Sequence, residues 1–202
     1  MNNIESEKTN VTEKSYSKPK NTKKSVILDM VYVAVFTAII SVLAQISVPL
    51  GVIVPFTLQT LGMFLAGAML GWKRGTLSVI LYVLLGAVGL PVFAGFSGGV
   101  SVLFGPTGGY IIGFIFTALV VGFMTDKLGR KLWVLAVSMV IGLLLCYIFG
   151  TAWFIILYNM QGKVMDLITA LGYCVFPFLI ADGLKIIVAA VLVNRLDKII
   201  KL

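Results

Sequence analysis

The sequence predicts an all-α integral membrane protein with six transmembrane helices and both termini in the cytoplasm. Its 202 residues are 59% hydrophobic, whereas a soluble domain is only about 45–50% apolar. Charged residues make up 12% of the chain, and the stretches 30–72, 75–125 and 132–161 contain none. A chain of this length has room for six spans of about 20 residues each.

Six apolar segments, separated by charged residues, prolines and glycines, are the expected spans. They cover residues 26–47, 57–72, 75–90, 108–125, 132–158 and 167–194. Residues 1–25 hold nine of the 24 charged residues, so we expect a disordered cytoplasmic tail there. A cleavable signal peptide is the competing interpretation, but the first apolar segment is long enough to span a bilayer. The remaining 177 residues, 26–202, form the expected six-helix transmembrane domain.

The second and third spans are short. At 1.5 Å per residue, 16 residues extend only about 24 Å, less than the ~30 Å of a hydrocarbon core. We therefore expect these helices to end below one surface and to leave a depression or a covering loop. The connecting segments 48–56 and 91–107 are apolar or rich in glycine, so their backbone should rest on protein rather than in lipid.

The distribution of Lys and Arg gives the orientation. Fourteen of the 16 cations lie in the tail, at 73–74, at 127–131 and after residue 194, all on one predicted side. Only Lys163 lies in the opposite loops, 48–56, 91–107 and 159–166, which should therefore face outward. The remaining cation, Lys185, falls inside the last span.

Several classes of function are excluded by composition. The chain has no His, and its two cysteines, Cys146 and Cys174, lie within apolar segments, so we expect neither a metal site nor a cofactor. The net charge of +8 does not indicate nucleic-acid binding, because the cations end apolar segments instead of forming one wet surface. There is no phosphate-binding loop and no nucleophile beside a His base, so we expect no enzyme activity.

Asp182 and Lys185 are the strongest site signal. Three residues apart, they share one helix face inside an apolar segment, where each charge costs about 2.5–3.5 kcal/mol. The pair should therefore face the bundle interior or a wet cavity. Three interpretations are open from sequence: an internal ion pair that fixes packing, a proton relay, or a site that binds a polar solute.

Small residues at four-residue spacing indicate where helix backbones approach closely. Gly67, Gly71 and Gly75 form one such ridge, and Gly105, Gly109 and Gly113 another; we expect both to pack within the bundle. Ala34 and Ala38 form a third ridge on the first helix, for which packing alone does not decide the partner.

The chain resembles the BioY biotin transporters, the substrate-binding S components of energy-coupling factor (ECF) transporters. The resemblance covers about residues 30 to 195 and rests on an ordered set of motifs. These are Thr57-Leu58-Gln59-Thr60-Leu61, Leu65-Ala66-Gly67 with Leu70-Gly71, Gly89-Leu90-Pro91-Val92-Phe93-Ala94-Gly95, Gly105-Pro106-Thr107-Gly108-Gly109-Tyr110 and Asp182-Gly183-Leu184-Lys185.

The resemblance implies the ECF S-component fold in a bacterial plasma membrane and capture of biotin from outside. Transport would then require a transmembrane T component and two cytoplasmic ATPase subunits. In this family group an Ala-x-x-x-Ala motif on the first helix docks the T component, and Ala34 and Ala38 match that motif.

Biotin has an anionic valerate tail, an apolar thioether ring and a ureido head, so its site needs a cation, an apolar wall and a few polar groups. We expect Lys185 to meet the carboxylate, and Asp182 to accept a ureido N–H or to hold Lys185. Thr57, Gln59 and Thr60 are polar candidates, with interhelical hydrogen bonding as the alternative. The candidate wall residues are Phe93, Tyr110 and Tyr82, with packing as the alternative. Segment 91–107 contains no Arg, Lys, Asn or Asp, so a second charged clamp from that loop is not expected.

The expected mechanism has three steps. The first outer loop closes over biotin, the face with Ala34 and Ala38 then meets the T component, and nucleotide-driven movement of that partner releases biotin inside. Two rivals remain open from sequence: a stand-alone proton-coupled carrier, and a structural membrane subunit without a ligand. Transport without ATPases would favour the first, and absence of small-molecule binding the second.

Overall fold

The computed structural model describes residues 22–48 and 54–199. The chain divides into two compact units, residues 1–31 and 32–202. Helix α2 (Thr22–Gln45) begins in the first unit and continues into the second, so residues 22–25 of the expected tail are helical. The rest of that tail, 1–21, lies outside the described residues, as does 49–53 in the first outer loop.

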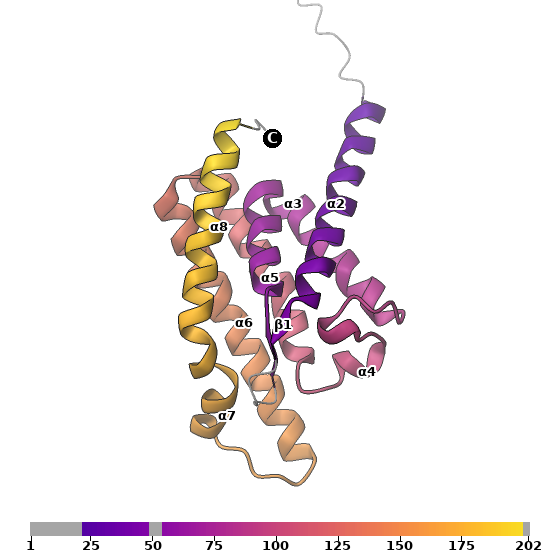
Figure 1. The fold of residues 1–202 in the computed structure, drawn as a ribbon, viewed down its shortest axis with the longest axis vertical. Coiled ribbons are helices and arrows are strands. Elements are labelled where there is room, and N and C mark those ends of the chain that lie inside the picture. Colours follow the sequence, from indigo (N-terminus) through magenta and orange to yellow (C-terminus); the bar gives the residue numbers. More distant parts are fainter. Residues whose placement is uncertain (1–21, 49–53, 200–202) are drawn as a thin grey trace, which may run out of the picture. The chain divides into compact units, whose positions relative to one another are not determined.

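The described residues of the second unit form helices and one short hairpin of strands, joined by turns (Figure 1). Its long helices after α2 are α3 (Gln59–Ala87), α5 (Gly108–Leu128), α6 (Leu132–Met160) and α8 (Leu179–Ile199), and its short elements are β1 (Ser47–Val48), β2 (Phe56–Thr57), η1 (Ala94–Phe96), α4 (Val100–Leu103), α7 (Leu167–Cys174) and η2 (Phe176–Phe178). Strands β1 and β2 are antiparallel, with Ser47 opposite Thr57. Helix α5 packs against both α3 and α6.

Helix α3 is two helices joined at Gly71, whose φ of 77° and ψ of −179° are not helical. Gly75 lies against the backbone of Ala66 and Gly67, which a continuous helix would hold about 12 Å apart, so the two arms fold back on each other. The first arm, 59–70, is only about 18 Å long and cannot cross a bilayer alone. The two short expected spans are therefore separate helices, and the break lies just before the basic pair at 73–74.

The predicted glycine ridges pack within the bundle. A Cβ on Gly67 would meet the backbone of Ala118 and Gly122 on α5, and one on Gly109 would meet Phe149 and Trp153 on α6. Gly113 lies against Cys146 in the same way. Close backbone contact at these positions leaves no room for a larger residue, so α5 is held tightly between α3 and α6.

The last expected span, 167–194, falls within one apolar stretch, Leu167–Ile199, that is long enough to cross a membrane, but its helix is not continuous. Helix α7 ends at Cys174, a 3₁₀ turn follows over Phe176–Phe178, and α8 begins at Leu179. Pro177 explains the break, because its ring and missing N–H do not fit a helix interior. As a result Asp182 lies in the first turn of α8, where the helix dipole favours a negative charge.

Arg130, in the turn between α5 and α6, joins three elements. Its guanidinium donates to the carbonyl oxygens of Ala68 (3.0 Å) and Met69 (2.7 Å) and forms an ion pair of 2.6 Å with Asp197 on α8. Asp126 on α5 accepts the N–H of Trp72 at 3.0 Å, at the start of the second arm of α3. Both helix ends at the Gly71 break are thus satisfied by side chains of the α5–α6 region.

The buried core of the second unit lies between α3, α5, α6 and α8. Its largest fully buried side chains include those of Phe64, Val79, Leu135 and Met139. Large apolar side chains are also exposed along the outer faces of these helices. Five stretches of the described residues, with α3 counted once, are long and apolar enough to cross a membrane. This pattern is that of a protein surrounded by lipid.

Candidate functional site

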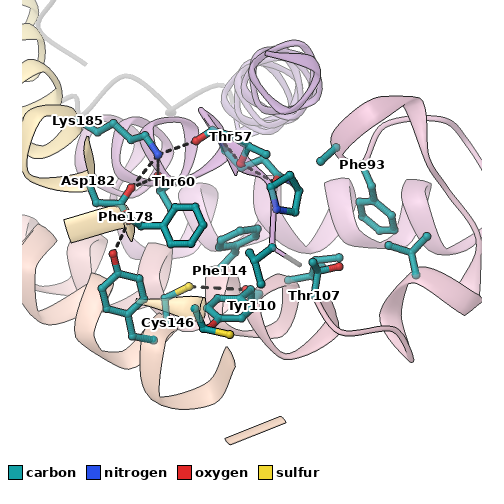
Figure 2. A pocket seen from close by; sticks show the side chains of 18 of the residues that line it. Thr57, Thr60, Phe93, Thr107, Tyr110, Phe114, Cys146, Phe178, Asp182 and Lys185 are labelled. Carbon is teal, nitrogen blue, oxygen red and sulfur yellow. Dashed lines mark hydrogen bonds and ion pairs between the residues drawn. The ribbon is translucent and has the colours of Figure 1, made fainter. Parts of the chain in front are cut away.

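A cavity of about 270 Å³ opens where the first arm of α3 and helix α8 begin (Figure 2). Its lining combines polar groups from β2, α3 and α8 with an apolar wall from α5, α6 and the segment 93–97. The lining residues are Val54, Pro55, Thr57, Gln59, Thr60, Phe93, Ala94, Ser97, Val102, Thr107, Tyr110, Ile111, Phe114, Cys146, Tyr147, Cys174, Phe178, Asp182 and Lys185. The short first arm of α3 leaves this space, as its length predicted.

Lys185 reaches the cavity from α8 and is 6% exposed. Its ammonium nitrogen donates to Asp182 at 2.7 Å, to the carbonyl oxygen of Thr57 at 2.6 Å and to the hydroxyl of Thr60 at 3.1 Å. It also lies 4.1 Å from the centre of the Phe56 ring. An ammonium group has three N–H donors, so these three acceptors occupy all of them.

Asp182 is 3% exposed and accepts bonds from three different helices. Its Oδ1 accepts hydrogen bonds from Lys185 and, at 3.3 Å, from the hydroxyl of Thr60. Its Oδ2 accepts a hydrogen bond from the hydroxyl of Tyr147 at 2.5 Å. A carboxylate offers about four accepting positions. The three described donors therefore leave one position on Oδ2 for a further donor in the cavity.

Thr57 and Gln59 form a local network at the start of α3. The hydroxyl of Thr57 donates to Oε1 of Gln59 at 2.9 Å, and the Gln59 amide nitrogen donates to the hydroxyl of Tyr82 at 2.5 Å. Tyr82 is fully buried behind Gln59 and is not among the residues that line the cavity. Its position is that of a support for Gln59 and Phe93.

Aromatic rings form much of the remaining wall. The ring of Phe93 is almost fully buried and meets Tyr82 edge to face at a centroid distance of 5.5 Å. The hydroxyl of Tyr110 lies 3.3 Å from that of Thr151, and Phe114 and Phe178 complete the apolar side. Such a wall suits a flat apolar ring, while the Asp182 side suits a polar group.

Seven of the eight residues predicted to bind substrate line this one cavity, and Tyr82 stands behind it. The sequence did not indicate Tyr147, Phe178 or the two cysteines as lining residues. A buried tyrosine hydroxyl needs a partner, so Tyr147 was a candidate for some polar contact. Only the packing of α6 against α8 identifies Asp182 as that partner.

The predicted partner ridge lies on the opposite side of α2 from the bundle contacts. Ala34 and Ala38 are exposed, together with Val35 and Ile39. On the other side of the helix, the hydroxyl of Thr37 donates to the carbonyl oxygen of Ser78 on α3 at 2.9 Å. The described residues of the second unit therefore leave the small-residue face of α2 uncovered.

Comparisons with known proteins agree with this architecture. The family model described as the BioY family matches residues 13–202. A protein of Thermotoga maritima named biotin transporter BioY is 46% identical over 170 residues, covering 84% of this chain and 96% of that protein. A probable biotin transporter BioY of Pyrococcus horikoshii is 42% identical over 165 residues, covering 82% of this chain and 93% of that protein.

A solved structure has a similar fold. It is the crystal structure of the S component for biotin from an ECF-type ABC transporter, and it superposes with a TM-score of 0.79 at 32% identity. The match covers 88% of this chain and 94% of that one. The two chains therefore share the fold of an ECF S component.

Proposed function

The chain belongs to the BioY family, and we propose that it captures biotin as the membrane-embedded S component of an ECF transporter. The observation that supports this best is the cavity, where a buried carboxylate with one accepting position left faces an aromatic wall. The matches cover nearly the whole length of relatives that are named for biotin transport, so the expected activity is transport rather than catalysis.

The cavity fits the chemistry of biotin at two ends. A ureido N–H can donate to the remaining accepting position on Asp182 Oδ2, beside the bond from Tyr147. The apolar thioether ring can lie against Phe114, Tyr110 and Phe178. Charge-assisted hydrogen bonds in a dry site are about twice as strong as neutral ones, so Asp182 would contribute much of the affinity.

Lys185 supports this arrangement by fixing the carboxylate. Direct contact of Lys185 with the biotin carboxylate remains our prediction from sequence, and it would require the ammonium to give up one of its three present acceptors. The Thr60 bond, at 3.1 Å, is the longest and the easiest to exchange. In either arrangement, removal of Lys185 leaves a buried carboxylate without its counter-ion.

The coupling partners belong to the same proposal. A T component would bind the uncovered face of α2 at Ala34 and Ala38, because small residues let two helix backbones approach closely. Two ATPase subunits would then supply the energy, since this chain has no phosphate-binding loop. Closure of the first outer loop stays a prediction, because residues 49–53 lie outside the described part of the chain.

The deciding experiment is equilibrium binding of labelled biotin to the purified chain in detergent. We expect tight binding by the parent and by Lys163→Ala, whose side chain is exposed in an outer loop, and none by Lys185→Ala. Absence of binding by a folded parent would contradict biotin as the ligand. Normal binding by Lys185→Ala would contradict the site.

Thiol labelling gives an independent measurement of where the ligand lies. The chain has only two cysteines, and both line the cavity. Saturating biotin should slow labelling of Cys174 by N-ethylmaleimide in the Cys146→Ser variant. An unchanged labelling rate at saturating biotin would place the ligand outside this cavity.

A further inference from the structure

The last residue of α2 contacts a segment nearly 50 residues later. The amide nitrogen of Gln45 lies 3.2 Å from the carbonyl oxygens of both Val92 and Phe93, and its Oε1 accepts the N–H of Phe96 at 2.8 Å. A longer contact of 3.5 Å reaches the carbonyl oxygen of Pro91. None of these contacts belongs to the network around Asp182.

The direction of the Gln45 amide is set by its partners. Its nitrogen faces carbonyl oxygens, including that of Ser41 at 3.0 Å, and its oxygen faces an N–H group. If the amide were rotated by half a turn, its oxygen would face the backbone carbonyl oxygens, and neither group could donate a hydrogen bond. A carboxylate at this position would do the same, so glutamate is the shape-matched substitution that breaks the contact.

The segment that Gln45 binds has an unusual backbone. Gly95 and Phe96 have φ values of 67° and 56°, and Phe96 is the one described residue other than glycine with positive φ. A bulky residue in this region is strained and persists only where its surroundings fix it. The side chain of Phe96 is 72% exposed, so its burial does not fix it. The contact that can fix the Phe96 backbone is the hydrogen bond from its N–H to Gln45.

This turn forms part of the cavity. Residues 93–97 are closed by a bond of 3.0 Å from the Phe93 N–H to the Ser97 carbonyl oxygen, and they contribute Phe93, Ala94 and Ser97 to the lining. The Phe93 ring is anchored against Tyr82, and Gly86 leaves room for it. Gln45 holds the outer side of the same turn.

We propose that Gln45 is a positioning residue for substrate retention: it locks the turn 93–97 into the shape that closes one side of the cavity. It acts through the turn, since Gln45 itself does not line the cavity. Because α2 also presents the Ala34 and Ala38 face, one helix joins the partner face to the cavity wall. The retention part of this inference rests on the proposed function.

The test compares Gln45→Ala and Gln45→Glu with Ser41→Ala, a control one turn earlier whose hydroxyl donates only within α2, to Thr37. Hydrogen exchange of peptides covering 93–99 should be about tenfold faster in both Gln45 variants, as expected for loss of one net hydrogen bond. Labelled biotin should dissociate about tenfold faster from them, and from Gln45→Glu fastest. Peptides of α5 and α6 should exchange as in the parent.

Three results would overturn the proposal. Unchanged exchange at 93–99 in Gln45→Ala would show that Gln45 does not hold the turn. Faster exchange there with an unchanged dissociation rate would show that the turn does not retain substrate, and faster exchange throughout the bundle would show a general loss of stability. If the parent fails to bind biotin, the proposed function fails, and the exchange comparison still decides the role of Gln45.

Discussion

Helix α8 takes part in two ion pairs that differ in burial and in their further hydrogen-bond partners. Asp182 and Lys185, near its start, are buried with side-chain exposures of 4% and 7%. Asp197, near its end, pairs with Arg130 at exposures of 38% and 20%. Fifteen residues separate the two aspartates, which is about 22 Å along the helix.

The hydrogen bonds of the Arg130 pair connect helices that are distant in sequence. The guanidinium binds Asp197 and two carbonyl oxygens at the end of the first arm of α3, so it joins α3, α8 and the α5–α6 turn. Neither Arg130 nor Asp197 lines the cavity described above.

The Asp182 pair is arranged differently. Lys185, Thr60 and Tyr147 donate to the carboxylate, and Asp182 lines a cavity. A buried charge pair costs desolvation energy that good packing could avoid, so the pair contributes less to stability than its short distances suggest. The difference between the two pairs teaches that lining a cavity, rather than ion pairing itself, distinguishes the pair of the candidate site.

The largest expected effect separates the two pairs by ligand binding. Asp182→Asn should weaken biotin binding at least about 100-fold, because it removes the charged acceptor and leaves Lys185 buried without a counter-ion. The double variant Asp182→Asn/Lys185→Met should recover stability lost in Asp182→Asn but not binding. Thermal unfolding and biotin titration measure the two quantities, and recovered binding in the double variant would contradict the site.

Arg130→Ala should show the reverse pattern. Loss of the guanidinium leaves Asp197 and two helix-end carbonyl oxygens without their donors, at a cost of about 2–4 kcal/mol in stability. The Kd for biotin of the folded fraction should stay within about twofold, since Arg130 lies far from the cavity. Lys131→Ala, at the neighbouring exposed residue, is the control. A large rise in Kd for Arg130→Ala would show that the two regions are coupled.

Tyr147→Phe tests one hydrogen bond to Asp182 alone. It removes the hydroxyl that donates to Asp182 Oδ2, and the ring still fills its place. Binding should weaken by about tenfold, the size of one hydrogen bond to a charged group. Tyr173→Phe, at a side chain that is 43% exposed, should leave the affinity unchanged. Equal affinities of Tyr147→Phe and the parent would mean that Tyr147 does not orient the carboxylate.

Substitutions on α2 should affect neither ion pair. Ala34→Leu and Ala38→Leu add bulk to exposed positions, so biotin binding by the isolated chain should not change. Uptake in cells that also express the T component and ATPases should fall, because bulky residues keep two helices apart. Val188→Leu, on an exposed part of α8, is the control. Normal uptake by both alanine variants would remove this face from the proposed interface.

The smallest effect is expected at Asp166, an exposed carboxylate that belongs to neither pair. It caps α7 by accepting the N–H of Thr169 at 3.3 Å, and bonds from Thr169 lower the pKa of the carboxyl below its usual 3.8. Because the pKa of this carboxyl is lower in the folded than in the unfolded chain, its ionised form stabilises the folded protein at pH values above the unfolded-state pKa. That stabilisation is lost as the pH falls through the folded-state pKa. Asp166→Ala should lower the Tm slightly at pH 7 and not at about pH 3. An equal Tm difference at both pH values would contradict capping by the ionised form.

The sequence was sufficient to predict a membrane protein, its two short helices and the burial of Asp182 and Lys185 inside the bundle. It did not indicate that the helix of the last span is divided at Pro177 into α7 and α8. It also placed Tyr82 in the cavity wall, whereas the structure places it behind Gln59. Hydropathy averages over a window and is insensitive to a single helix break, and it gives no direction for a side chain beyond its own helix.

Local chemistry along the chain determined which residues are apolar, where charge is absent and which two charges stand alone in an apolar segment. Those properties follow from residue type and helical spacing. Tertiary structure alone decided that Tyr147 meets Asp182, that Arg130 closes the opposite end and that Gln45 holds the turn 93–97. Each of these contacts joins residues at least 35 positions apart, and which distant groups meet is set by how the helices pack.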